Sequence, residues 1–198
     1  MFSDENVSKY RKPEFPAERI FVNRWSPRAM SGEEITEKEL MTLFEAAKWA
    51  PSSYNNQSWR FIYAKKNTEY WKKLFDLMGE FNQAWAKNAS VLVVIISKKT
   101  FDFNGKPSIT HSFDSGSAWM SLALQGSIKR FVVHGMQGFD YDKTKKDLEI
   151  PEEFEVEAMA AIGKPGKKEF LPKEMQEKEF PSDRKKLKEI VFEGKFRE

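Results

Sequence analysis

The run Val91–Ile96, which reads VLVVII, is the feature that most constrains how this chain can fold. Such a run is far too short to cross a bilayer, which takes about 20 apolar residues in a helix. Side chains on a strand alternate between the two faces of its sheet, so a continuous apolar run suits a strand that is buried on both faces. The sequence therefore predicts a buried strand at the centre of a sheet.

Composition narrows the class of protein. The chain has 198 residues, of which 40% are hydrophobic and 32% charged, as expected for one globular domain with a charged surface. The 33 basic and 30 acidic residues nearly cancel to a net charge of +3, which gives no argument for a nucleic acid or an anionic membrane as partner. The N-terminus lacks an apolar signal region, so we expect a cytoplasmic protein.

Residue usage also excludes several kinds of site. There is no cysteine, which rules out disulfides, thiol nucleophiles and thiolate metal ligands, and two histidines alone cannot build a usual zinc site. We therefore expect no metal. The sequence contains no G-x-G-x-x-G, no G-x-x-x-x-G-K-[ST], no G-x-S-x-G and no H-E-x-x-H motif. The sequence therefore gives no support for a Rossmann or P-loop nucleotide site, a serine hydrolase or a zinc protease.

The clearest helix is predicted between Ile35 and Pro51. Thr36 and Glu39 have the spacing of a capping box at its start. Leu40, Leu43, Phe44 and Ala47 follow at i, i+3, i+4 and i+7, which places them on one face, and Pro51 marks the end.

Shorter patterns predict the remaining elements. They are strands at 59–64, 90–97 and 155–163, a helix with Tyr70, Leu74, Leu77 and Met78 on one face, a helix at about 112–129, a loop at 131–140 and a charged helix before Ile150. The helix at 112–129 has hardly a charge after Asp114, which favours burial in a core or, as we prefer, between subunits. Strands and helices mix without strict alternation, so the expected fold class is α+β, a sheet flanked by helices.

Three polar segments stand out as candidate binding elements. Arg24, Ser26 and Arg28 offer guanidinium and hydroxyl groups that suit a phosphate. The stretch Ala50–Trp59, APSSYNNQSW, offers amides that suit a flat heterocycle, and Arg184–Lys188 is a basic cluster. Each segment taken alone is more simply explained as surface: solvated arginines, a hydrogen-bonded connector and a solvated helix start.

In this order, however, the segments resemble motifs of the nitroreductase family of FMN-dependent oxidoreductases, from about Arg19 to the C-terminus. The matched motifs are R-x-S-x-R/K at Arg24–Arg28, A-P-S-S-x-N-x-Q-P-W at Ala50–Trp59 with Ser58 in place of proline, P-x-x-G-F-D at Gly135–Asp140 with Gly135 in place of proline, I-G-x-P at Ile162–Pro165, and R-K-x-L-x-E-I/V at Arg184–Ile190. Any one motif is weak, whereas the five in sequence are a strong signal.

The resemblance implies a fold and an assembly. Members of this family are α+β homodimers with a mostly antiparallel central sheet and intertwined subunits, in which both chains build each of two FMN sites. By analogy, residues 1–18 form an N-terminal arm, and residues 19–198 form a single FMN-binding domain.

The resemblance also implies which residues bind the cofactor: Arg24, Trp25, Ser26, Arg28, Ser52, Ser53, Asn55, Gln57, Gly135, Met136, Gln137, Gly138, Arg184 and Lys186. Within this set, Arg24, Ser26, Arg184 and Lys186 would hold the phosphate, and Arg28 would reach N1 and O2 of the flavin. Ser52, Ser53, Asn55 and Gln57 would line the flavin bound mainly by the other subunit, and the Gln137 amide would face N5.

The activity implied is NAD(P)H-dependent reduction of nitroaromatics, quinones or similar acceptors by a ping-pong mechanism. No catalytic side chain is expected, because the flavin carries the hydride. Tyr54, Phe113 and His134 are candidates for the substrate pocket, although core packing is favoured for Phe113 and a structural role for His134. The alternatives are a specialised flavin enzyme of the same fold, such as a reductive dehalogenase or a flavin-processing enzyme, and a flavin-binding module without turnover.

Overall fold

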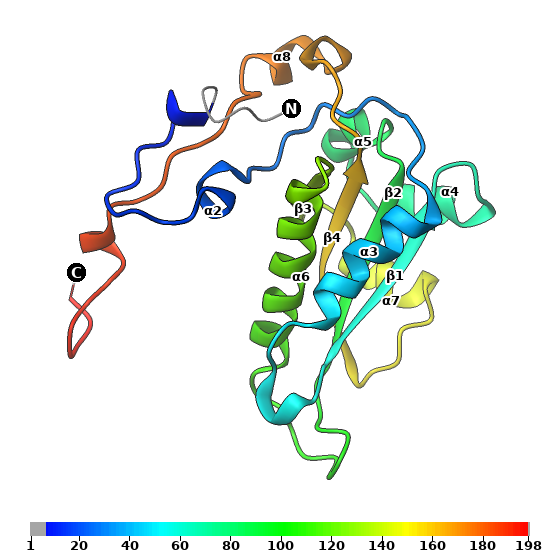
Figure 1. Ribbon diagram of the computed structural model, residues 1–198. Helices are drawn as coiled ribbons and strands as arrows, with labels where there is room; N and C mark the ends of the chain where they lie inside the picture. The colour runs from blue at the N-terminus through cyan, green and yellow to red at the C-terminus, as the bar shows by residue number, and fades with distance from the viewer. Residues whose placement is uncertain (1–6, 198) are drawn as a thin grey trace.

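A four-stranded antiparallel sheet forms the centre of the protein in a computed structural model that describes residues 7–197. Residues 1–6 of the predicted arm and Glu198 of the predicted domain lie outside the described residues. The strand order is β1 (Trp59–Lys65), β2 (Val91–Lys98), β4 (Phe154–Gly163) and β3 (Val132–Met136) (Figure 1). This arrangement confirms the predicted α+β class.

Strand β2 is buried on both faces, as its apolar run predicts. Its residues Val91, Val93 and Ile95 belong to one hydrophobic cluster, and Leu92, Val94 and Ile96 belong to another on the opposite face. The strand pairs with β1 on one side and β4 on the other, so its backbone groups are satisfied within the sheet.

Helices cover both faces of the sheet (Figure 1). The first cluster packs under α3 (Glu37–Lys48) and α6 (His111–Ile128). The second packs against α4 (Glu69–Phe75) and α5 (Glu80–Ala86), and α7 (Tyr141–Asp147) contacts β4. Further short elements are α2 (Arg19–Asn23), η1 (Ser53–Asn55), η2 (Lys168–Phe170), α8 (Lys173–Gln176) and η3 (Leu187–Glu189).

The predicted capping box starts helix α3. The Glu39 backbone N–H donates to Thr36 Oγ1 over 3.3 Å, and the Thr36 N–H donates to Glu39 Oε2 over 2.8 Å. Leu40, Leu43 and Ala47 are buried on the predicted face. Local sequence is thus sufficient to explain where this helix begins and which side it buries.

Two expected elements differ in the structure. The helix that begins at Glu69 ends at Phe75, and Tyr70 is 59% exposed instead of sharing a buried face with Leu74. The chain leaves the helix because Leu77 O accepts from Asp140 N over 2.9 Å, and Gly79 N donates to Gly138 O over 3.0 Å.

The expected loop at 131–140 begins as strand β3. Val132–Met136 pairs antiparallel with residues 159–163 of β4, so partners distant in sequence decide its conformation. Residues 137–140 form the loop proper and bond to the turn between α4 and α5. This turn is therefore fastened beside the end of β3.

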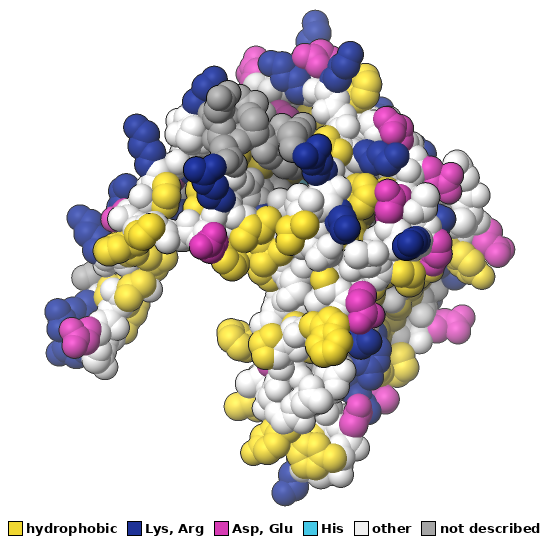
Figure 2. Space-filling view, in the orientation of Figure 1, with side chains coloured by type: hydrophobic (Ala, Val, Ile, Leu, Met, Phe, Trp, Pro, Cys, Tyr) yellow, Lys and Arg dark blue, Asp and Glu magenta, His cyan; other side chains and the backbone are white. Residues whose placement is uncertain are grey.

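Two segments from the ends of the chain run together away from the sheet (Figure 1). We call residues 7–23 and 180–197 the arm pair. The Tyr10 and Phe180 rings stack with centroids 5.2 Å apart, and the Leu187 N–H donates to Glu14 Oε1 over 2.8 Å. Helix α2 of the arm pair contacts α6, whereas a wide hollow separates the outer part of the arm pair from the rest of the molecule (Figure 2). Within residues 7–197, no helix has the length and apolar character needed to cross a membrane.

Candidate functional site

A cavity of about 280 Å³ lies where the 24–28 loop meets the arm pair, and we call it the basic cavity. Its charged lining residues are all cationic. The lining consists of Arg11, Arg24, Trp25, Ser26, Arg28, Lys178, Phe180, Ser182 and Arg184. The structure therefore brings together Arg24, Trp25, Ser26, Arg28 and Arg184 from the predicted site, across 160 residues of sequence.

Arginine donors in the basic cavity are left unused by the protein. The Nε atoms of Arg24 and Arg28 are buried and have no hydrogen-bond partner among the described residues. Arg24 Nη1 donates to Ser26 Oγ over 3.2 Å. Burial and the nearby Arg184 charge both lower the pKa of Arg24. Buried like charges with free donors are costly unless an anion joins them, so the chemistry of this cavity suits a phosphate.

Arg11 is a member of the basic cavity that the sequence did not reveal. It is 7% exposed, and its guanidinium donates to Ser182 O (2.8 Å), Val22 O (2.6 Å) and Arg24 O (2.8 Å). Burial, followed by repulsion from Arg184 and Arg24, lowers the pKa of Arg11 to about 10. The side chain thus stays charged at neutral pH while it fastens the two halves of the arm pair to the 24–28 loop.

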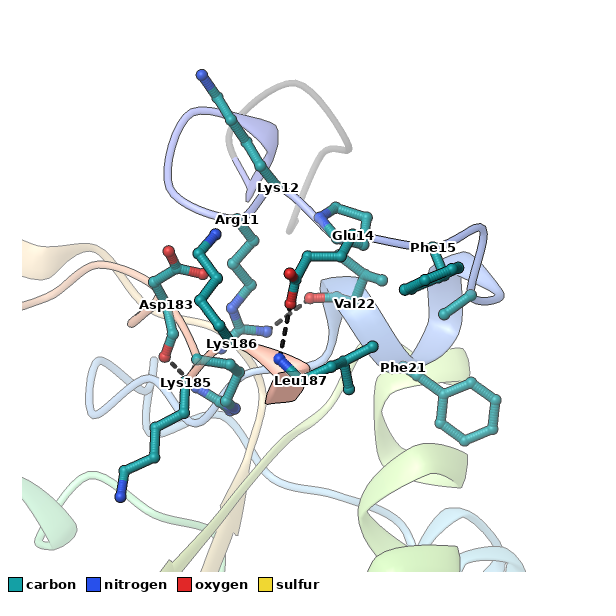
Figure 3. A pocket seen from close by; sticks show the side chains of 13 residues that line it. Arg11, Lys12, Glu14, Phe15, Phe21, Val22, Asp183, Lys185, Lys186 and Leu187 are labelled. Carbon is teal, nitrogen blue, oxygen red and sulfur yellow. Dashed lines mark hydrogen bonds between the residues drawn. The ribbon is translucent and has the colours of Figure 1, made fainter. Parts of the chain in front are cut away.

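The basic C-terminal cluster divides between two cavities. Arg184 lines the basic cavity, and its Nη1 donates to Ser182 Oγ and to two neighbouring carbonyls. Lys186 instead lines a second cavity within the arm pair, between residues 11–22 and 183–187 (Figure 3). Of the two predicted C-terminal phosphate ligands, the structure brings only Arg184 to Arg24 and Ser26.

His134 ties the end of the sheet to the 24–28 loop. Its Nδ1 lies 2.9 Å from Pro27 O, and its ring packs against Trp85 with centroids 4.5 Å apart. Burial lowers the pKa of His134 to about 4, so the ring is neutral at pH 7. Because a carbonyl oxygen only accepts, the Nδ1–H must donate to Pro27. These contacts are those of a structural histidine.

The predicted flavin loop, Gly135–Gly138, starts in β3, and its last two residues are exposed to solvent. A Cβ on Gly135 would lie 2.9 Å from Trp119 Cζ2, so the indole packs directly on this backbone. Met136 is buried, whereas Gln137 and Gly138 are exposed. Trp119 Nε1 is buried without a partner among the described residues, which adds an unused donor beside this loop.

Arg28 links the basic cavity to the flavin loop. Its guanidinium lies 5.9 Å from the centre of the Phe81 ring on α5. Phe81 and Gly138 both line an open depression next to the cavity. A cationic end and an aromatic-lined end are thus adjacent on one side of the molecule.

The APSSYNNQSW loop lies at the opposite end of the sheet, by η1 (Figure 1). Asn55 and Gln57 are exposed, Ser52 and Ser53 are half-buried, and Tyr54 is 80% exposed. Phe113, at the start of α6, is 77% exposed. These residues do not line the basic cavity of their own chain.

Residues 22–164 match the sequence model of the Nitroreductase family. A solved structure of an oxidoreductase containing FMN is 45% identical, with a TM-score of 0.90 over 94% of this chain and 96% of that chain. Protein DrgA of Synechocystis is 26% identical over 68% of this chain and 79% of its own. An oxygen-insensitive NADPH nitroreductase of Helicobacter pylori is 36% identical, over only 33% of this chain and 30% of its own. With its FMN-type motifs and a family match over most of its length, the chain belongs to the nitroreductase family of oxidoreductases.

Proposed function

We propose that this protein is an FMN-dependent NAD(P)H oxidoreductase that reduces nitroaromatics, quinones or similar acceptors by a ping-pong mechanism. The observation that carries the proposal is the basic cavity, where buried arginine donors with no partner in the described chain lie near the exposed end of the Gly135–Gly138 loop. The FMN content of the 45% identical relative supports the choice of cofactor. The NADPH-dependent Helicobacter relative supports the choice of reductant.

The donor set fits FMN because it has a place for each part of the molecule. Arg24, Ser26 and Arg184 would hold the phosphate, and no acidic residue lines the cavity within the described chain to balance the charge of the two arginines. Arg28, which lies between the cavity and Phe81, would extend to the ring system. Bound FMN supplies the hydride transfer, so the residues of this chain need to bind, orient and shield.

We propose further that the active form is a homodimer. Hydrophobic side chains are visible on both sides of the hollow in Figure 2. The exposed apolar residues include Phe15, Phe21, Ile190, Val191 and Phe196 in the arm pair and Phe113 and Ile128 in α6. A second copy in this hollow would cover them, and it would bring the 52–57 loop of one chain toward the basic cavity of the other. This arrangement would explain why the predicted site residues fall into two groups at opposite ends of one chain.

The cavity within the arm pair is consistent with a role in assembly. It is lined by Phe15, Phe21, Val22 and Leu187 with a basic rim that includes Lys12 and Lys185, and Glu14 and Leu187 bridge its two sides (Figure 3). Apolar walls with charged residues at the rim suit contact with another protein surface. We propose no small ligand for this cavity.

The test is purification followed by spectroscopy and binding. We expect bound flavin to give its visible absorbance bands, and added FMN to bind more tightly than riboflavin, which lacks the phosphate. Arg24→Met and Arg184→Met should each remove most of this preference, on the order of tenfold or more per lost charged hydrogen bond. Lys146→Met, which removes an exposed cation on α7, is the matched control and should not change binding.

Turnover is tested separately. Stopped-flow bleaching of the flavin by NADH or NADPH, followed by recovery on addition of a quinone or nitroaromatic, is the expected result. A protein that takes up no FMN would refute the proposal. Bound flavin that neither nucleotide reduces would instead identify a flavin-binding module or a specialised flavin enzyme.

A further inference from the structure

The loop that the family motif predicts to face the flavin has a strained backbone. Tyr54, Asn55 and Gln57 all have left-handed φ angles, of 52°, 53° and 50°. Asparagine tolerates this region, but tyrosine and glutamine adopt it at a cost in free energy, and the loop contains no glycine. Such a conformation persists only where surrounding contacts impose it.

The buried carboxylate of Asp114 imposes part of it. Asp114 is 4% exposed in the first turn of α6, and its Oδ2 accepts from the Ser53 backbone N–H over 3.0 Å. Its other contact is with Thr110 Oγ1, at a longer distance of 3.4 Å. Asp114 therefore commits its buried carboxyl group chiefly to the backbone of the loop.

The side chain of Asn56 holds the loop from the other side. Asn56 is 9% exposed, its Nδ2 donates to Thr100 O over 3.2 Å, and its Oδ1 accepts from Asp102 N over 2.9 Å. Both ends of the amide thus bind the backbone of the 99–108 segment. An aspartate or a leucine of similar size could not supply both a donor and an acceptor there.

Neighbouring polar residues of the loop therefore have different roles. Asn56 and Ser58 are buried and fasten the loop, whereas Asn55 and Gln57 on either side of Asn56 remain exposed. Gln57 N also donates to Ser52 Oγ over 3.0 Å, which closes the loop on itself. The exposed amides are therefore held at fixed places by residues that cannot reach a ligand.

We propose that Asp114 and Asn56 are positioning residues for the cofactor: they hold the 52–57 loop in its strained conformation, and so present Asn55 and Gln57 to FMN. The inference rests on the proposed function, since it requires that FMN binds. Neither residue is itself expected to touch the cofactor.

Four variants test this role through FMN affinity, measured by quenching of FMN fluorescence. Asp114→Ala and Asn56→Ala should each weaken binding roughly tenfold, as expected for a lost hydrogen bond to a charged or buried group. Asp114→Asn keeps an oxygen acceptor for Ser53 N–H and should recover most of the affinity. Asn104→Ala, which removes an exposed amide from the adjacent segment, is the matched control and should bind normally.

A double-mutant cycle separates positioning from general stability. Asn55→Ala should weaken FMN binding in the wild-type background but have little further effect in Asp114→Ala, because the loop is already displaced. Equal effects in both backgrounds would overturn the inference, as would wild-type affinity in Asp114→Ala and Asn56→Ala. If Asp114→Ala fails to fold, the same cycle with Asn56→Ala decides the question. A wild-type protein that binds no FMN refutes the proposed function and this inference together, whereas wild-type binding with insensitive variants refutes the inference alone.

Discussion

His134 Nδ1 lies 2.9 Å from the carbonyl oxygen of Pro27, and this contact joins strand β3 to the loop that carries Arg24 and Arg28. The two residues are separated by 107 positions in the sequence. The bond sets how the exposed end of the Gly135–Gly138 loop lies relative to the basic cavity. Protonation of this buried imidazole would therefore affect both the stability of the fold and the geometry of the site.

The lowered pKa of His134 predicts an acid-sensitive contribution to stability. Its pKa falls from 6.5 to about 4 on folding, mainly through burial. Between these values the unfolded chain binds the extra proton and the folded chain does not, so stability rises with pH. The contribution is complete above about pH 6.5 and is lost as the pH falls toward 4; its size is roughly 3 kcal/mol.

His134→Asn provides the measurement, because the amide nitrogen can replace Nδ1–H as donor to Pro27 O and does not titrate. Urea unfolding of both proteins at a series of pH values should show a steeper loss in the wild type between about pH 6.5 and pH 4. Parallel profiles would mean that folding does not lower the pKa of His134.

Arg130→Gly should stabilise the protein. Helix α6 ends with the Phe131 N–H donating to Gly126 O over 2.7 Å and the Arg130 N–H donating to Ser127 O over 3.1 Å, which is a Schellman motif. Arg130 occupies its left-handed position, with a φ of 63°, where glycine is usual. Glycine there should raise the free energy of unfolding by about 1 kcal/mol. Thermal unfolding measures this gain in stability. Lys129→Gly, one residue earlier at the end of the helix, should destabilise the protein instead.

Local patterns explain the parts of the fold that depend on near neighbours. The Thr36–Glu39 capping box and the apolar run of β2 follow from spacing alone, and both are confirmed. Strand β3 was missed because Val132–Met136 is short and contains His134 and Gly135, so its pairing with β4 decides its state. The early end of α4 has the same cause, since bonds to the 138–140 segment replace helical ones.

In the candidate site, too, the sequence reveals the residues that lie in local motifs but not those placed by distant contacts. Arg24, Ser26 and Arg184 could be named because they lie in recognisable motifs, and the basic cavity brings them together. Arg11 lies in an ordinary charged stretch, and its partner Ser182 is 171 positions away. No pattern in the sequence distinguishes such a residue from solvated surface. Likewise, the 52–57 loop contains no glycine, so its sequence gives no sign of the left-handed backbone at Tyr54, Asn55 and Gln57.

Gly166→Ala should disturb the fold and the site together. A Cβ on Gly166 would lie 2.4 Å from Met30 C and 2.5 Å from Met30 O, which are backbone atoms that cannot rotate away. The surrounding bonds, Gly166 N to Ala29 O and Ser31 N to Lys164 O, both 3.0 Å, would have to lengthen. We expect a loss of about 1–3 kcal/mol in unfolding free energy and weaker FMN binding, because Arg28 lies beside the displaced backbone. Urea unfolding and FMN titration measure the two effects; Lys167→Ala, exposed and adjacent, should change neither.

The proposed homodimer predicts that two chains share each site, and mixed dimers test this. Arg184→Met impairs the basic cavity, and a variant with both Asn55→Ala and Gln57→Ala impairs the loop at the other end of the chain. Each homodimer should then bind FMN poorly. In a heterodimer of the two, one site would receive the intact cavity of one chain and the intact loop of the other, while the second site would carry both defects.

Co-refolding equal amounts of the two variants should therefore restore a defined number of sites that bind FMN tightly. Random pairing makes half of the dimers mixed, each with one intact site, so about a quarter of the wild-type number of tight FMN sites should appear. Titration of FMN fluorescence counts them, and light scattering checks that the mixture is dimeric. If each site were built from a single chain, every chain would still carry its defect, and the mixture would bind no better than its parents.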